Sequence, residues 1–187
     1  MIRKIITCIM ALLFLSLEAY AGPLLLQMDQ EVSGEAPSQV ILGYDTVGGS
    51  TTNFTSACNK YTNTGATFTL TKGYVYTTSS YDFVMSVWSV DGSGDPDTNI
   101  ACSDVNDSAD GGGSWRAVDF TGGDQISIVN GTDYWICFNN SSGSFVRYYD
   151  AAGSIDTYYY NLGNLTCDGQ LNYSTYDRWY SMYISNQ

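Results

Sequence analysis

The stretch YDFVMSVWSV, residues 81–90, decides the fold of this chain. Phe83, Met85 and Val87 share one parity along it, as expected for the apolar face of a half-buried β-strand. The other parity is more polar: Asp82, Ser86 and Trp88, interrupted by Val84 and Val90. The stretch therefore predicts a central strand, and the segments on either side of it in the sequence read as further strands that could pair with it.

The remaining segments predict more strands and no helix. Turn-forming residues separate them, notably Asn63-Thr64-Gly65, the acidic DGSGDPD run at residues 91–97 and the hairpin signal Asn130-Gly131. The predicted strands, besides the central one, are residues 39–44, 54–61, 66–71, 73–77, 99–103, 115–120, 124–129, 132–138, 144–149, 155–160 and 178–184. About ten short strands of this kind predict an all-β, antiparallel β-sandwich of jelly-roll type.

The first 21 residues have the pattern of a secretory signal peptide. Arg3 and Lys4 precede an apolar run, and Ala19-Tyr20-Ala21 is a small-x-small cleavage site. Residues 22–38 form a polar leader, expected to be either flexible or an added edge strand, and residues 39–187 form a single β-sandwich domain. We therefore expect a protein that is secreted or held at the cell surface. Without a second apolar run, no membrane insertion is predicted.

Four cysteines follow the predicted cleavage site, which indicates two disulfides in a secreted chain. Three pairings are possible, and we favour Cys58–Cys102 with Cys137–Cys167. Zinc binding is the weaker alternative, because the sequence contains neither a C-x-x-C motif nor a histidine.

The charge balance limits the partners. The chain carries a formal net charge of −12, and removal of residues 1–21 brings this to about −13. Nucleic acid is therefore not an expected partner, because its recognition requires a basic surface. The acidity either keeps a secreted protein soluble or supplies ligands to calcium.

The residue types needed for general acid–base catalysis are scarce, so the sequence does not predict an enzyme. Histidine is absent, and the only glutamates after residue 21 are Glu31 and Glu35, both in the leader. Paired aspartates could serve a glycosidase, but most aspartates here lie in predicted turns.

Several stretches occur in an order that resembles a known type of domain. They are ILGYDTVGG (41–49), FTL (68–70), VMSVWS (84–89), DGSGDP (91–96), SWRAVDF (114–120) and NGTDYWICF (130–138). Over roughly residues 40–140 the chain resembles small jelly-roll domains of secreted bacterial and phage-associated proteins, which are similar in build to carbohydrate-binding modules. The resemblance implies the fold and brings no catalytic residues. Because no enzyme is attached here, it favours an independent adhesive or structural role.

All four tryptophans fall on the more polar parity of their predicted strands: Trp88, Trp115, Trp135 and Trp179. If these parities face outward, the surface carries flat rings among Asp, Ser and Asn, which is what a sugar requires for stacking and hydrogen bonding. The tyrosine runs add Tyr148 and Tyr159 to the candidate ligand-binding residues. The alternative is that the tryptophans pack in the core, where most tryptophan surface lies.

Acidic loops are the candidate metal ligands. Asp91, Asp95 and Asp97 have partial EF-hand-like spacing, but Pro96 replaces the required glycine and no glutamate follows at the twelfth position. Ordinary acidic turns are the favoured interpretation, and no other cofactor is predicted.

The sequence thus leads to two hypotheses. The first is a secreted, non-catalytic β-sandwich that binds an extracellular polysaccharide or cell-surface glycan through exposed aromatic residues. The second is a structural subunit of an extracellular filament or matrix. In that case the leader, residues 22–38, would add a strand to the sheet of another copy of the chain.

Overall fold

A computed structural model describes residues 39–187 except 55, 79, 107–112, 141–144, 151–156, 161–164, 168–170 and 173–178. Within the strands, only the backbone is described at residues 50–54, 145–150, 157–160, 171–172 and 179. The predicted signal peptide and leader lie outside the described residues.

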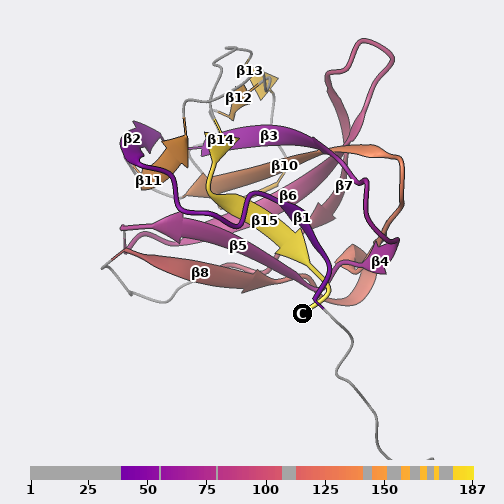
Figure 1. The fold of residues 1–187 in the computed structure, drawn as a ribbon, viewed down its shortest axis with the longest axis horizontal. Coiled ribbons are helices and arrows are strands. Elements are labelled where there is room, and N and C mark those ends of the chain that lie inside the picture. Colours follow the sequence, from indigo (N-terminus) through magenta and orange to yellow (C-terminus); the bar gives the residue numbers. More distant parts are fainter. Residues whose placement is uncertain are drawn as a thin grey trace, which may run out of the picture. The chain divides into compact units, whose positions relative to one another are not determined.

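One sheet, here called the back sheet, contains the central strand predicted from residues 81–90. Its six antiparallel strands follow the order β13 (Leu171–Asn172), β12 (Thr157–Tyr160), β3 (Ser56–Thr62), β10 (Asp133–Asn140), β6 (Phe83–Val90) and β7 (Pro96–Cys102). Strand β6 pairs with β10 and with β7, the segment that follows it in the sequence (Figure 1). The segment that precedes it, residues 72–77, is also expected from the sequence to pair with it but lies in the other sheet.

The second sheet, here called the front sheet, has seven strands. They are β1 (Ile41–Gly43), β2 (Ser50–Phe54), β5 (Lys72–Thr77), β8 (Ser114–Asp119), β11 (Phe145–Asp150), β14 (Trp179–Tyr180) and β15 (Met182–Ser185). Its path runs β1-β15-β5-β11-β14, with β8 on the other edge of β5 and β2 on β11. A small ladder joins β4 (Phe68–Thr69) to β9 (Ser127–Ile128), and a 3₁₀ turn, η1, spans Gly122–Asp124.

Eight of the strands pair in the order of a jelly roll. In chain order they are β1, β3, β5, β6, β7, β8, β10 and β15. Within the front sheet the order β1-β15-β5-β8 joins the first, eighth, third and sixth of these strands, and within the back sheet β3-β10-β6-β7 joins the second, seventh, fourth and fifth. This arrangement of two Greek keys confirms the predicted antiparallel jelly-roll sandwich. No helix in the described part of the chain is long and apolar enough to cross a membrane.

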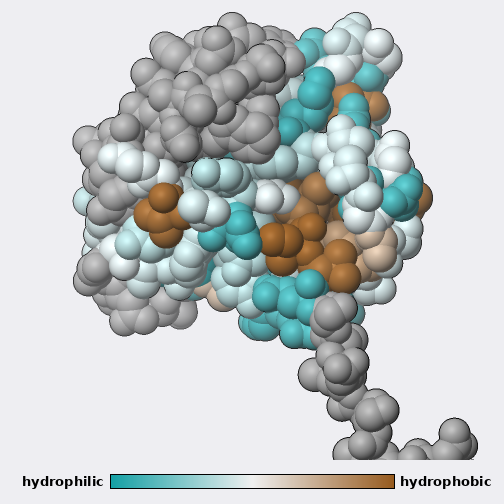
Figure 2. All heavy atoms as spheres, viewed as in Figure 1, coloured by the Kyte–Doolittle hydropathy of each residue, from teal (hydrophilic) through white to brown (hydrophobic). Residues whose placement is uncertain are grey.

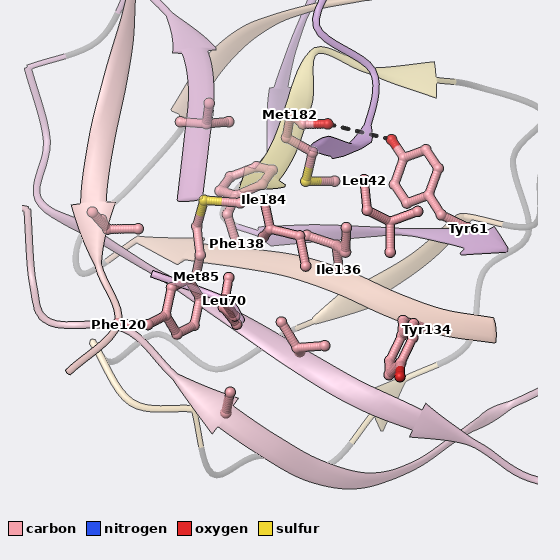
Figure 3. Packing of buried hydrophobic residues seen from close by; sticks show 14 of the residues in the cluster. Leu42, Tyr61, Leu70, Met85, Phe120, Tyr134, Ile136, Phe138, Met182 and Ile184 are labelled. Carbon is pink, nitrogen blue, oxygen red and sulfur yellow. Dashed lines mark hydrogen bonds between the residues drawn. The ribbon is translucent and has the colours of Figure 1, made fainter. Parts of the chain in front are cut away.

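The core lies between the two sheets. Phe83, Met85 and Val87 of β6 are fully buried in it, so the predicted apolar parity is correct. They pack with side chains of β10 and β15, of which Figure 3 labels Ile136, Phe138, Met182 and Ile184. Complete burial of each such side chain contributes about 1.5–3 kcal/mol to the free energy of unfolding.

Two predicted connections are wrong in detail. The Asn130-Gly131 turn forms, with Gly131 at a φ of 75°, but it does not close a two-stranded hairpin. The strand before it, β9, pairs with β4, whereas β10 pairs with β3 and β6. In addition, the predicted strand 54–61 is divided between the sheets: β2 ends at Phe54 and β3 begins at Ser56.

The disulfides join Cys58 to Cys137 and Cys102 to Cys167, so two disulfides are present but the favoured pairing is wrong. Strands β3 and β10 are neighbours, and their register places Cys58 directly opposite Cys137. This proximity arises from pairing between residues 79 apart in the sequence, which cysteine spacing does not reveal.

Candidate functional site: an aromatic platform on the front sheet

Two of the four tryptophans are buried, contrary to the expectation that their parity faces solvent. Trp88 and Trp135 lie opposite each other in β6 and β10, with exposed fractions of 6% and 0%. As predicted, they lie on the face of the back sheet that points away from the core, where they pack beside the Cys58–Cys137 disulfide. Both rings are nevertheless buried there and offer little surface to a ligand.

A short segment held by a disulfide lies over the same face. The amide of Asn99 donates to the carbonyl of Cys167 (3.0 Å), and that of Asn139 donates to the carbonyl of Thr166 (3.2 Å). The Cys102–Cys167 disulfide fastens the same segment to β7. Residues 166–167 therefore lie over the outer face of the back sheet.

Both buried indole N–H groups donate hydrogen bonds. Trp88 Nε1 donates to Ser86 Oγ (3.0 Å), and Trp135 Nε1 donates to the carbonyl of Gly94 (3.1 Å). The ammonium group of Lys60 lies 5.6 Å from the centre of the Trp135 ring. Satisfied donors are what buried tryptophans require, and they indicate a packing role.

Three other predicted ligand-binding residues have described backbones only. Trp179 begins β14, Tyr148 lies in β11 and Tyr159 lies in β12. Their side chains lie outside the described part of the structure, so their place in a binding site stays a prediction.

Trp115 is the predicted residue that belongs to an aromatic surface. It lies on β8, on the outer face of the front sheet, and is half-exposed. Its ring is edge-on to two tyrosines: Tyr76, with centroids 5.6 Å apart, and Tyr183, with centroids 5.1 Å apart. Edge-to-face pairs at these distances are attractive because the positive ring edge meets the negative ring face.

A fourth ring extends this surface. Tyr74 stacks on Tyr183 with centroids 4.7 Å apart and an angle of 17° between the ring planes. All four rings are half-exposed. We call this group the aromatic platform: Tyr74, Tyr76, Trp115 and Tyr183.

Strand alternation and register explain why the platform forms. In β5, Gly73, Val75 and Thr77 face the core and are buried, so Tyr74 and Tyr76 face outward. Register then places Tyr183 opposite Tyr74 on one side and Trp115 opposite Tyr76 on the other. Three strands thus contribute rings to one surface.

Three of the four platform residues are not among the predicted ligand-binding residues: Tyr74, Tyr76 and Tyr183. The sequence KGYVYT does carry the signal, because Tyr74 and Tyr76 alternate with Gly73 and Val75. What it lacks is the identity of the neighbouring strands, which come from residues 114–119 and 182–185.

Two phenol groups of the platform donate hydrogen bonds to main-chain oxygens. Tyr74 Oη donates to the carbonyl of Gln187 and Tyr76 Oη to the carbonyl of Gly113, both at 2.9 Å. Burial is the main cause that raises the pKa of the Tyr183 phenol above 10.0, and the nearby Tyr74 raises it further. This phenol therefore stays protonated at neutral pH.

An ion pair lies on the same face. Lys72 Nζ is 2.5 Å from Asp119 Oδ1, across the β5–β8 pairing. The hydrogen bond to Asp119 raises the pKa of the Lys72 ammonium. Both side chains are partly exposed, so the pair contributes little to stability.

The candidate calcium ligands serve the backbone of their own turn. Asp91 Oδ1 accepts hydrogen bonds from the backbone N–H groups of Ser93 and Asp95, both at 2.8 Å. Asp97 Oδ2 accepts from the hydroxyl groups of Ser89 and Thr98. Within the described residues, no three His, Cys, Asp or Glu side chains gather as metal ligands. These contacts give the acidic turn a structural role, and calcium binding there remains an untested prediction.

A surface hollow of about 440 Å³ lies where β6 ends and β10 begins. Ser89, Val90, Asp91, Gly131, Thr132, Asp133 and Tyr134 line it. Its one aromatic side chain, Tyr134, is 5% exposed, and Asp133 already accepts a hydrogen bond from Thr62. The hollow therefore offers little ring surface to a ligand.

The aromatic platform is accordingly the candidate functional site. It presents ring surface and phenol oxygens, which suit non-covalent binding. The visible face in Figure 2 is largely neutral to hydrophilic, and its largest apolar area lies near the C-terminus.

No family model and no curated protein matches the sequence, so comparison with known proteins identifies no relative.

Proposed function

We propose that this protein is a secreted, non-catalytic module that binds an extracellular polysaccharide or cell-surface glycan through the aromatic platform. The carrying observation is the packing of Trp115 with Tyr183 and Tyr74 on an outer sheet face, with all three rings half-exposed. Sugars stack their C–H faces on aromatic rings and direct their hydroxyls to nearby polar groups. The platform offers both kinds of contact.

The pre-ordering of the rings favours binding. Each ring is held by at least one neighbouring ring, and two of the phenols also hold backbone carbonyls. Little side-chain entropy is then lost when a ligand binds, and such losses otherwise cost about 0.5–1.5 kcal/mol for each mobile side chain. Aromatic side chains are therefore economical contact groups.

Two features support secretion. Residues 1–21 carry the signal-peptide pattern, and two disulfides join the four cysteines that follow it. Disulfides persist chiefly in oxidising compartments, including the cell exterior.

The test is affinity electrophoresis of the purified protein, residues 22–187, in gels that contain single polysaccharides. Wild type is expected to be retarded by at least one polysaccharide. Trp115→Ala should lose that retardation, and Tyr183→Ala should weaken it. Tyr81→Ala is the matched control, because it removes an exposed tyrosine in the β5–β6 connection.

Circular dichroism shows that each variant is folded before its binding is compared. Equal retardation of wild type and folded Trp115→Ala in every gel would contradict the proposal.

A further inference from the structure

We infer that the aromatic platform selects uncharged or amine-bearing glycans and rejects polyanionic ones, such as those built from uronic acids. This inference rests on the proposed function and adds the class of ligand. It follows from which hydrogen-bonding groups and which charges surround the rings.

The phenol of Tyr74 presents an acceptor to a ligand. The hydroxyl hydrogens of Tyr74 and Tyr76 are donated to the carbonyls of Gln187 and Gly113. The lone pairs that remain on Tyr74 Oη accept hydrogen bonds from O–H or N–H groups. A carboxylate or sulfate offers only acceptors and has no such hydrogen to give.

The charges beside the rings act in the same direction. Asp45 is exposed and close enough to Tyr183 to raise the pKa of its phenol. Asp119 lies on the outer face at the β8 edge, where it neutralises Lys72. A ligand carboxylate would meet two carboxylates and a cation that is already paired.

Few described cations could compensate. Of the basic side chains that the structure describes, Lys72 alone lies on the outer face of the front sheet. Lys60 lies over Trp135 on the back sheet, and Arg116 is 3% exposed beside Phe83 in the interior. The net charge of −12 adds long-range repulsion of polyanions at low salt.

The ion pair gives a precise test, because Asp119→Asn leaves Lys72 as an unpaired cation beside Tyr74. The control is the double variant Lys72→Gln/Asp119→Asn, which removes the pair without creating a cation and keeps the net charge of wild type. Both positions are partly exposed, so both variants should fold.

The probes are hydroxyethylcellulose and xyloglucan as neutral chains, chitosan oligomers as cationic chains and polygalacturonate as the polyanion. Affinities are measured by isothermal titration calorimetry at about 0.02 M and 0.15 M salt. We expect wild type to bind a neutral or cationic probe, with dependence on Trp115, at least about tenfold more tightly than polygalacturonate. At low salt, Asp119→Asn should reduce severalfold the ratio between the affinity for that probe and the affinity for polygalacturonate. The double variant should leave this ratio unchanged.

Three outcomes overturn the inference. Polygalacturonate binding to wild type as tightly as the neutral probes, and lost in Trp115→Ala, would contradict the selectivity while leaving the proposed function standing. An unchanged affinity ratio in Asp119→Asn would contradict the electrostatic cause. Absence of Trp115-dependent binding to all four probes would refute the proposed function and the inference together.

Discussion

Trp115 of β8 contacts Tyr183 of β15 across the intervening strand β5, with ring centroids 5.1 Å apart. The two residues are separated by 68 positions in the sequence and by one strand in the sheet. Tyr74, which β5 contributes between them, faces the small residue Ala117 in β8. This small neighbour leaves room for the Trp115 ring to extend diagonally toward Tyr183.

The different settings of the tryptophans predict losses of stability of different size. Trp135→Ala should lower the free energy of unfolding by about 3–5 kcal/mol, because Trp135 is fully buried. Trp115→Ala should lower it by about 1–2 kcal/mol, since that ring is half-exposed and loses two edge-to-face contacts. Urea denaturation followed by circular dichroism measures both. A larger loss in Trp115→Ala than in Trp135→Ala would contradict the assignment of surface and core.

The disulfide pairing predicts which cross-linked peptides a non-reducing digest contains. Mass spectrometry should find Cys58 with Cys137 and Cys102 with Cys167. The two disulfides join residues that are 79 and 65 positions apart in the sequence. In the chain-entropy treatment, loss of either disulfide should lower the free energy of unfolding by about 4 kcal/mol.

The second disulfide also has a spectroscopic consequence. In the variant Cys102→Ser/Cys167→Ser, the segment at residues 166–167 loses its covalent tie to β7, and acrylamide should quench tryptophan emission more strongly than in wild type. Wild type is the reference, because it keeps that tie. Quenching equal to that of wild type in the folded variant would show that the tie does not protect Trp88 and Trp135.

Alkaline pH should destabilise the fold. Burial raises the pKa of Tyr61 well above its ordinary value of 10.0, and its hydroxyl donates toward the carbonyl of Met182 (Figure 3). Because the folded state holds this proton more tightly than the unfolded state, the stabilisation is complete below pH 10 and is lost as the pH rises further.

Urea midpoints measured between about pH 8 and pH 11 test this pH dependence. The urea midpoint of wild type should fall above about pH 10. The midpoint of Tyr61→Phe should fall less steeply with pH, because phenylalanine has no proton to lose at this position. Lys72 and Tyr183, whose pKa values are also raised, leave a residual slope in that variant. An identical slope in wild type and Tyr61→Phe would contradict the role of Tyr61.

Gly73 provides a packing test beneath the platform. A Cβ atom there would lie 2.7 Å from Met85 Sδ and 3.1 Å from a methyl carbon of Val118. Gly73→Ala should therefore cost about 1–3 kcal/mol through overpacking. At Gly123, by contrast, an added Cβ meets nothing within 4 Å, so Gly123→Ala is the matched control. Denaturation midpoints should differ clearly between the two variants.

The sequence predicts the fold well because alternation is a local property. Phe83, Met85 and Val87 share one parity along the strand, and the structure buries them between the sheets as expected. Local alternation also assigns Trp88 to the opposite face correctly. It does not show that a distant segment, fastened through Cys167, lies over that face.

The candidate site was predictable only in part for the same reason. The sequence indicates Trp115 because it is a large ring on a polar parity. Its partners Tyr74 and Tyr183 come from strands that the jelly-roll topology places beside it, and single-sequence periodicity carries no information on strand order. The same limitation explains the wrong cysteine pairing.

The most direct test of the central claim is the tryptophan emission of the protein, titrated with the polysaccharide that retards it most in the gel. If the platform binds the glycan, wild type shows a saturable blue shift or quench. Trp115→Phe, which keeps a ring at the site, still binds but loses most of that signal, because Trp88 and Trp135 are buried elsewhere. A signal of undiminished size in Trp115→Phe would show that the glycan binds away from Trp115, and would contradict the account.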